Sequence, residues 1–265
     1  MCATCGCSDE QDELGELDLL ALGHDHEHGH DHRHGHDDGR VVTLQQKILA
    51  KNDDLAQRNR DWLRERGILA LNLMSSPGSG KTTLLERTSH DLAGTVTLSV
   101  VEGDQETALD ADRIRAAGCR VVQINTGAGC HLDAAMVGRA LRTLDPPAGS
   151  AVMIENVGNL VCPALFDLGE TARVVLASVT EGTDKPLKYP QMFRRADLVV
   201  ITKTDLGPYV NFDVGAFGEY IGQVSPQAMM ISLSAVTGSG MACWYEWLTG
   251  MLPGGGWLAV PAAAD

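Results

Sequence analysis

Residues 75–83 read Ser-Ser-Pro-Gly-Ser-Gly-Lys-Thr-Thr, and they directly follow an apolar run at 68–74. Gly78 and Gly80 allow a tight backbone turn whose N–H groups can point at phosphate oxygens. A helix that begins after such a turn adds the partial positive charge of its N-terminus. The segment therefore predicts a strand, a phosphate-binding loop and a helix from about residue 82.

Two side chains of this loop are expected to carry its chemistry. Lys81 would neutralise the β- and γ-phosphates of a nucleotide, and the Thr82 hydroxyl would ligate Mg²⁺. Ser75 stands where such loops usually have their first glycine. A Gly/Ser turn with an unrelated lysine is the alternative, which the flanking strand and helix disfavour. The predicted phosphate contacts are Gly78, Ser79, Gly80, Lys81, Thr82 and Thr83.

Apolar, β-branched runs alternate with helical stretches along most of the chain. Continuous apolar runs suit strands that are covered on both faces of a sheet. The pattern predicts an α/β fold of the P-loop NTPase type, a doubly wound and mainly parallel sheet spanning residues 68–252. The expected strands are 68–74, 95–101, 120–125, 151–154, 174–178, 198–202 and 229–233.

Three further parts complete the expected organisation. Residues 1–39 hold eleven Asp and Glu against one Arg, a net −10 that leaves −4 of the total −14 for the remainder. This polar arm is expected to be disordered. Residues 40–67 form a helical lead-in, with Leu44, Ile48, Leu55 and Leu63 near helical spacing and Gly67 as its stop. Residues 253–265 form a flexible Gly/Ala/Pro-rich tail.

The charge distribution and the lack of targeting signals exclude several classes of function. The nearly balanced body offers no basic surface for nucleic acid and no cationic helix for a membrane surface. The run 68–74 is too short to span a bilayer, and no secretory signal pattern opens the chain. We therefore expect a cytoplasmic protein, in which seven cysteines bind metal or perform chemistry rather than form disulfides.

A second motif concerns the nucleotide base. Thr202-Lys203-Thr204-Asp205 ends an expected strand and resembles the guanine-reading NKxD motif of GTPases, with Thr202 in place of Asn. The Asp205 carboxylate can accept hydrogen bonds from guanine N1–H and the N2 amine together, which adenine cannot match. Ser234 and Ala235 resemble the second base-contacting loop. GTP is therefore favoured over ATP, although a hydroxyl copies an amide only in part and guanine selectivity is open.

Two carboxylates are expected to complete the hydrolytic site. Glu155 ends the strand 151–154 and is assigned to Mg²⁺, directly or through water. Asp104 follows the strand 95–101 and is assigned to Mg²⁺ or to orienting the attacking water. For each, a loop carboxylate that caps a helix or faces solvent is the alternative, and for Asp104 the two are evenly matched.

Soft metal ligands crowd the start of the chain. Cys2, Cys5 and Cys7 suit one Ni²⁺, Zn²⁺ or Cu⁺ ion, and affinity alone does not choose among these metals. Seven histidines then alternate with Asp, Glu and Gly, a pattern that favours weak nickel buffering over an engineered tag of consecutive histidines. These are His24, His26, His28, His30, His32, His34 and His36.

A second thiol set lies on two later loops. Cys130 and His131 occupy a Gly-rich turn, and Cys162 lies shortly after Glu155. Both loops should emerge at the carboxyl end of the sheet, beside the nucleotide. Spacing alone leaves an incomplete tetrahedral metal site and unrelated free cysteines equally tenable. The remaining cysteines, Cys119 and Cys243, are interpreted as packing residues.

The motifs together resemble the HypB family along the whole chain. They are the MCxxCGC start, the His-rich insert, an AKND segment before the domain, and the segments 75–86, 102–114, 127–134 and 155–164. The last two, GxGCHLDA and ENVGNLVCPA, distinguish HypB from its urease counterpart UreG. The resemblance implies a SIMIBI-type fold, a high-affinity nickel site at Cys2, Cys5 and Cys7, and a second nickel or zinc site at Cys130, His131 and Cys162.

The resemblance also implies a function and partners. It implies a GTPase that delivers nickel for nickel–iron hydrogenase maturation, exchanging metal with a HypA-type nickel chaperone and finally the hydrogenase large subunit. A nucleotide-dependent homodimer is implied near the second metal site. Two alternatives remain: a nickel storage protein whose nucleotide domain is secondary, and a P-loop kinase acting on a small molecule, which leaves the cysteine sets unexplained.

Overall fold

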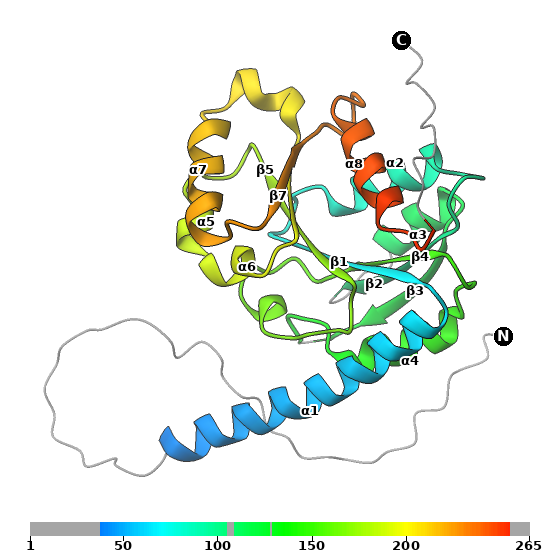
Figure 1. The fold of residues 1–265 in the computed structure, drawn as a ribbon. Coiled ribbons are helices and arrows are strands. Elements are labelled where there is room, and N and C mark those ends of the chain that lie inside the picture. The colour runs from blue at the N-terminus through cyan, green and yellow to red at the C-terminus, as the bar shows by residue number, and fades with distance from the viewer. Residues whose placement is uncertain (1–37, 105–108, 128, 255–265) are drawn as a thin grey trace, which may run out of the picture. The chain divides into compact units, whose positions relative to one another are not determined.

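The described chain is organised around one parallel sheet. The computed structural model describes residues 38–104, 109–127 and 129–254. Within them, seven strands pair in the order β3-β2-β4-β1-β5-β6-β7, and every pair is parallel (Figure 1). The strands are β1 (Leu69–Ser75), β2 (Leu98–Asp104), β3 (Arg120–Asn125), β4 (Ala151–Glu155), β5 (Ala172–Ser178), β6 (Leu198–Thr202) and β7 (Met229–Ser232).

Helices cover both faces of this sheet, as Figure 1 shows for α2, α3 and α8 on one side and α1 and α4 on the other. The helices are α1 (Asp38–Glu65), α2 (Lys81–Asp91), α3 (Leu109–Ala116), α4 (Ala134–Leu144), α5 (Lys185–Lys188), α6 (Pro190–Arg194), α7 (Val214–Val224) and α8 (Met241–Gly250). Short 3₁₀ turns are η1 (Cys162–Ala164) and η2 (Thr204–Tyr209). The prediction of a doubly wound parallel sheet is confirmed.

Alternation along β1 shows why both faces need a cover. Leu71 and Leu73 pack with α2 and α8 residues such as Trp244, whereas Ala70 packs with α4 residues on the opposite face. Successive side chains of a strand point to opposite faces, so an apolar run buries both. This central strand delivers the glycine-rich loop to the carboxyl edge of the sheet.

Strand boundaries differ from the predictions by a few residues. The largest shift is at β2, which begins at Leu98 rather than at residue 95. The Val96 N–H donates to the Leu92 carbonyl, so the end of α2 and its following turn hold residues 92–97. Asp104 consequently lies in the last position of β2 rather than in the loop after it.

The buried face of the lead-in helix α1 matches the one that apolar spacing predicts only in part, since Leu63 belongs to both. Ile48 is 37% exposed, whereas Asn52, Ala56, Asn59 and Leu63 are buried. Their spacing of four, three and four residues defines one helical face. Gly67 adopts φ +60° just beyond the helix, as its expected role as a stop requires. The buried face of α1 is therefore half polar, which a search for apolar periodicity misses.

Gly169 allows α1 to approach the chain before β5. Its φ is +87°, and an added Cβ would overlap the Ala56 carbonyl and lie 2.7 Å from the Asn59 Cβ. We expect Gly169→Ala to lower the free energy of unfolding by about 2–5 kcal/mol, from left-handed strain and overpacking together. Gly94 is the matched control, because its φ is +79° and no heavy atom lies within 4 Å of an added Cβ. In urea denaturation, an equal loss in the two variants would refute the close packing.

Among the described residues, none of the helices is both long and apolar enough to cross a membrane.

Candidate functional site

The glycine-rich loop adopts the backbone that phosphate binding requires. Gly78 and Gly80 have φ values of +72° and +95°, and α2 begins at Lys81. Its buried ammonium donates to the Ser75 hydroxyl over 2.9 Å, and burial lowers the pKa of Lys81. Ser75 has no positive φ, so glycine is unnecessary there, and its hydroxyl accepts from the lysine instead.

A buried carboxylate faces the loop. The Thr82 hydroxyl donates to Glu155 Oε1 over 2.8 Å, while Glu155 Oε2 has no hydrogen-bond partner among the described residues. Burial raises the pKa of Glu155 to about 7. An oxygen buried without a partner beside a threonine hydroxyl is a suitable place for a hard cation. Thr82 and Glu155 thus fit Mg²⁺.

A third acid, Glu102, escaped the sequence analysis. It is the register partner of Glu155 on the neighbouring strand, and its Oε2 is likewise buried without a partner in the described structure. Burial, followed by the charge of Glu155, raises the pKa of Glu102 to about 8. The predicted strand ended at residue 101, just before Glu102, and the pairing of β2 with β4 is what brings the two acids together.

These groups line one cleft of about 450 Å³. Asp104 lies on its wall, as do Asp110 and Arg113 of α3. The Arg113 guanidinium is held by Glu86 and Asp110 at 2.7 and 3.2 Å. The cleft therefore combines the cationic loop with a concentration of carboxylates, which suits a phosphate chain carried with a divalent cation.

The expected base-reading residues adjoin the same loop. A smaller pocket of about 130 Å³ is bordered by Gly80, Thr83, Thr202, Asp205 and Ala235. The Ser234 hydroxyl donates to Asp205 Oδ1 over 2.5 Å, so the two predicted base segments meet. Lys203 adopts φ +59°, and its ammonium donates to the Gly78 carbonyl over 2.6 Å.

Thr202 has a structural partner that its motif position did not reveal. Its buried hydroxyl donates to the Ser79 carbonyl over 2.6 Å. This bond ties the carboxyl end of β6 to the phosphate loop, and it needs only a donor, which threonine supplies. Ser79 is held from the other side as well, because its hydroxyl donates to Glu181 over 2.7 Å.

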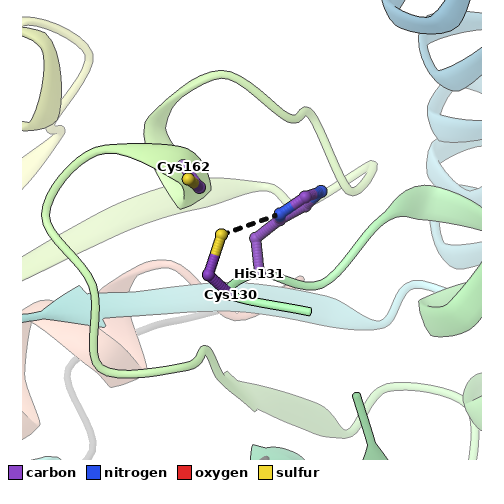
Figure 2. A group of neighbouring side chains, drawn as sticks. All are labelled: Cys130, His131 and Cys162. Carbon is purple, nitrogen blue, oxygen red and sulfur yellow. Dashed lines mark hydrogen bonds between the residues drawn. The ribbon is translucent and has the colours of Figure 1, made fainter. Parts of the chain in front are cut away.

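The second thiol set converges. One ligand atom from each of Cys130, His131 and Cys162 lies within 4.8 Å of the others, and Figure 2 shows Cys162 facing the other two from a separate loop. Cys130 Sγ lies 3.6 Å from His131 Nδ1. Two thiols and an imidazole fit a soft or borderline metal ion such as Ni²⁺ or Zn²⁺.

Packing orients the His131 ring, and burial changes the pKa values of His131 and Cys162. The His131 ring stacks on Phe166, with centroids 4.0 Å apart, and burial lowers the pKa of His131. Burial, followed by a hydrogen bond with Cys130, raises the pKa of Cys162 to about 11. The metal-free set therefore holds a neutral imidazole and a protonated Cys162 thiol, and a bound metal must displace the proton. Phe166 was not identified from the sequence.

Consecutive residues connect the two sites. Glu155 accepts from Thr82, and Asn156 Oδ1 accepts from the Leu132 backbone N–H over 3.3 Å, next to His131. Gly158 then packs on the loop, because a Cβ there would lie 3.0 Å from Pro77 Cα. The segment between β4 and Cys162 thus touches both the phosphate loop and the thiol loop.

The remaining sequence-predicted residues lie elsewhere. The N-terminal cysteines and the histidine tract fall outside the described residues, as does the tail beyond residue 254. Cys119 is buried, in agreement with a packing role, whereas Cys243 is exposed, so the packing interpretation is wrong for Cys243. Exposure follows from its position on α8, whose inward residues include Trp244 and Leu248.

The glycine-rich loop after a central parallel strand, with carboxylates and base-contacting segments on the same edge, defines a SIMIBI-type P-loop nucleotide-binding protein. A family model described as the CobW/HypB/UreG nucleotide-binding domain matches residues 69–232. The chain belongs to this family and, within it, to the HypB hydrogenase maturation factors.

Individual relatives support that assignment. The hydrogenase maturation factor HypB of Rhizobium leguminosarum bv. viciae is 54% identical over 209 residues, covering 79% of this chain and 70% of the relative. That of Escherichia coli K12 is 51% identical over 209 residues, covering 79% and 72%.

Solved structures agree with them. HypB from Archaeoglobus fulgidus superposes with a TM-score of 0.72 at 43% identity, covering 77% of this chain and 99% of the other. HypB from Helicobacter pylori in complex with nickel gives 0.70 at 41%, covering 75% and 93%.

Proposed function

We propose that this protein is a GTP-hydrolysing nickel metallochaperone that delivers nickel during maturation of nickel–iron hydrogenase. The observation that carries the proposal is the adjacency of Glu155 and Asn156. One contacts Thr82 in the phosphate loop, and the next contacts the loop that bears Cys130 and His131. A change at one site can therefore alter the other through two neighbouring residues.

In this proposal the cleft residues bind and hydrolyse GTP. Lys81 neutralises the β- and γ-phosphates, and the backbone of the glycine-rich loop cradles them. Thr82 and Glu155 hold Mg²⁺, with Asp104 assisting them or orienting the attacking water. When bound, Mg²⁺ supplies charge neutralisation for the phosphates. Glu102 adds a further carboxyl group to the same cleft. Hydrolysis gives GDP and phosphate.

Base selection tests the GTP assignment. Asp205→Asn is expected to weaken GTP binding by about 10–100-fold, because a charge-assisted hydrogen bond contributes about 1.5–3 kcal/mol. The same variant should bind xanthosine triphosphate more tightly than the wild type, because the amide can donate to the xanthine C2 carbonyl. Titration with fluorescent nucleotides measures both constants. Loss of affinity for both nucleotides would argue that Asp205 only supports Ser234.

Nickel is the proposed cargo of two ligand sets. Cys2, Cys5 and Cys7 form the high-affinity set, and the seven histidines from His24 to His36 buffer nickel weakly. Cys130, His131 and Cys162 form the nucleotide-sensitive set, which also suits zinc. The nickel complex of the Helicobacter pylori relative supports nickel as the cargo. We infer a cytoplasmic protein, a nucleotide-dependent homodimer, a HypA-type chaperone as partner, and the hydrogenase large subunit as final acceptor.

Nickel storage is the alternative function, which the density of histidines in residues 1–39 favours. A deletion of these residues distinguishes storage from delivery. The proposal expects that a strain lacking its own copy regains hydrogenase activity with the full chain but not with Cys130→Ala. A chain lacking residues 1–39 should show a defect at limiting nickel. If maturation survives both changes unaltered, the delivery role is wrong. If it survives only the deletion, storage is the role of that arm.

A further inference from the structure

The two loops that bear the thiol set have no covalent connection near the cluster. Cys130 and His131 precede α4, which begins at Ala134, and Cys162 precedes the segment 167–169. The distance between the two sulfurs therefore depends on whatever holds the start of α4 against that segment. A metal site tolerates little error in such spacing.

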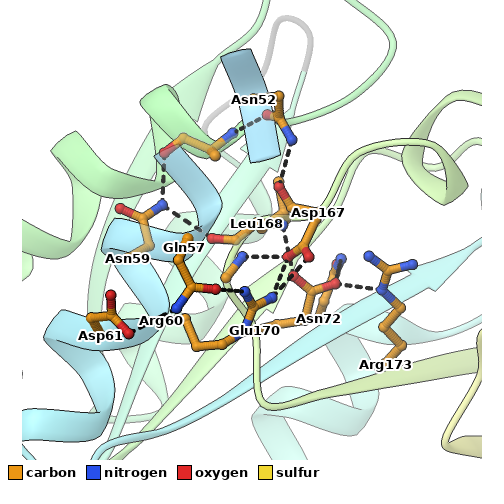
Figure 3. A network of polar contacts seen from close by, with 12 residues as sticks. Asn52, Gln57, Asn59, Arg60, Asp61, Asn72, Asp167, Leu168, Glu170 and Arg173 are labelled. Carbon is orange, nitrogen blue, oxygen red and sulfur yellow. Dashed lines mark hydrogen bonds and ion pairs between the residues drawn. The ribbon is translucent and has the colours of Figure 1, made fainter. Parts of the chain in front are cut away.

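Two asparagines of α1 make that connection, as Figure 3 shows. Asn52 Oδ1 accepts from the Ala134 N–H over 2.9 Å, while Asn52 Nδ2 donates to the Asp167 carbonyl over 2.8 Å. Asn59 Nδ2 donates to the Ala134 carbonyl over 2.8 Å and to the Leu168 carbonyl over 3.0 Å. Each amide thus bridges both loops, and both polar backbone atoms of Ala134 are held by α1.

The burial of these amides shows that polar residues are needed there. Asn52 and Asn59 are each 5% exposed and lie two turns apart on one face of the helix. A buried amide is tolerated only when it is hydrogen-bonded, and each of these forms bonds to two different loops. An apolar residue at either position would leave backbone groups without partners.

Glycines bring α1 close enough for these bonds. A Cβ at Gly138 of α4 would lie 2.6 Å from Asn59 Oδ1, and Gly169 lies under the same turn of α1. Arg60 adds an ion pair, since its guanidinium donates to both carboxylate oxygens of Asp167 at 2.7 and 2.8 Å. The attachment is thus specific to one register of the helix against the two loops.

A chain of hydrogen bonds also connects Leu168 with Asn156, the residue that follows Glu155 of the nucleotide cleft. The Leu168 N–H donates to buried Glu170 over 2.7 Å, and Glu170 accepts from Asn72 over 3.2 Å. Asn72 in turn accepts from Asn156 over 3.2 Å, and Asn156 accepts from the Leu132 N–H. The polar chain therefore runs from one thiol-bearing loop, through β1 and Glu170, to the other.

We propose that Asn52 and Asn59 of α1 are positioning residues for the metal site, setting the separation of Cys130 and Cys162 by bridging Ala134 to residues 167–168. This inference rests on the proposed metal-binding role of the thiol set. Asn52 and Asn59 are not themselves ligands of that set, and they act on its geometry through the backbone of Ala134, Asp167 and Leu168.

The test compares three buried positions of α1 in a protein whose N-terminal cysteines are replaced by alanine. Asn52→Ala and Asn59→Ala are each expected to weaken Ni²⁺ binding by about 10–100-fold, the range for residues that orient metal ligands. Both should also shift the thiolate-to-metal bands of the Co²⁺-loaded protein, with GTP affinity unchanged. Leu63→Ala is the matched control, because Leu63 is buried one turn further along the same face.

The control separates positioning from stability. Leu63→Ala should lower the melting temperature at least as much as the asparagine variants, yet keep the wild-type nickel affinity and spectrum. If Leu63→Ala weakens nickel binding equally, or the asparagine variants bind nickel normally, the proposal is overturned.

A second probe works without a metal. An arsenical that bridges two neighbouring thiols should bind the parent protein, fail with Cys130→Ala, and bind more slowly to Asn59→Ala. Equal capture by the parent and Asn59→Ala would overturn the inference. If the parent binds the arsenical but not nickel, the proposed function is wrong. The rates of arsenical binding by the parent and by Asn59→Ala would still test whether the asparagines set the separation of the two thiols.

Discussion

Replacing Lys81 with alanine is expected to lower the rate of GTP hydrolysis by about 10²–10³-fold, the usual loss when one preorganised charge-stabilising group is removed. The buried ammonium lies at the N-terminus of α2 and lines the nucleotide cleft. Single-turnover hydrolysis with saturating GTP measures the chemical step directly. Near-normal turnover would mean that phosphate charge is neutralised elsewhere.

The Lys81 variant should remain folded, which makes this loss interpretable. Burial lowers the pKa of Lys81, so the folded protein holds this ammonium at a cost in hydration. We therefore expect the nucleotide-free variant to melt no lower than the wild type. A melting temperature well below that of the wild type would show that Lys81 is needed for the fold, and the rate comparison would then have to use stability-matched protein.

Cys162→Ala should produce the largest effect on metal binding. In a background without the N-terminal cysteines, we expect nickel affinity at the loop site to fall by more than about 100-fold, beyond the loss typical of residues that only orient ligands. The set holds only three candidate ligands among the described residues, so removing one leaves too few protein donors for a tetrahedral ion.

Cys243→Ala is the matched control, since Cys243 is an exposed free cysteine on α8, outside the cluster. It should bind nickel as the parent does. Equal losses from the two replacements would mean that nickel is bound non-specifically by thiols, and an unchanged affinity in Cys162→Ala would remove this residue from the site.

Much of the fold could be predicted because its signals are local. β6 has the boundaries expected from its apolar run, since a strand covered on both faces needs continuous apolar residues. β3 also has the predicted boundaries, although it is a partly exposed strand at the edge of the sheet. The glycine-rich loop was likewise identifiable, because its backbone demands glycine at Gly78 and Gly80. The start of β2 was predicted too early, because the turn residues after α2 continue the helical hydrogen-bond pattern.

The candidate site could be predicted only where residues act within one segment. Glu102 depends on the pairing of β2 with β4, and Phe166 on the folding of a loop against His131. The proximity of Cys162 to Cys130 is a tertiary contact, which spacing left open. The same reason hid Asn52 and Asn59, because a buried polar helix face looks like a solvated one until its partners are known.

We infer that nucleotide occupancy changes the metal site through Glu155 and Asn156. The most direct test is a nickel titration of the protein lacking Cys2, Cys5 and Cys7, with a non-hydrolysable GTP analogue and without nucleotide. We predict dissociation constants that differ by about 5–150-fold, the usual range for coupled sites, and a smaller ratio in Asn156→Ala. Equal nickel affinity in the two nucleotide states of the parent protein would mean that the two sites are not coupled.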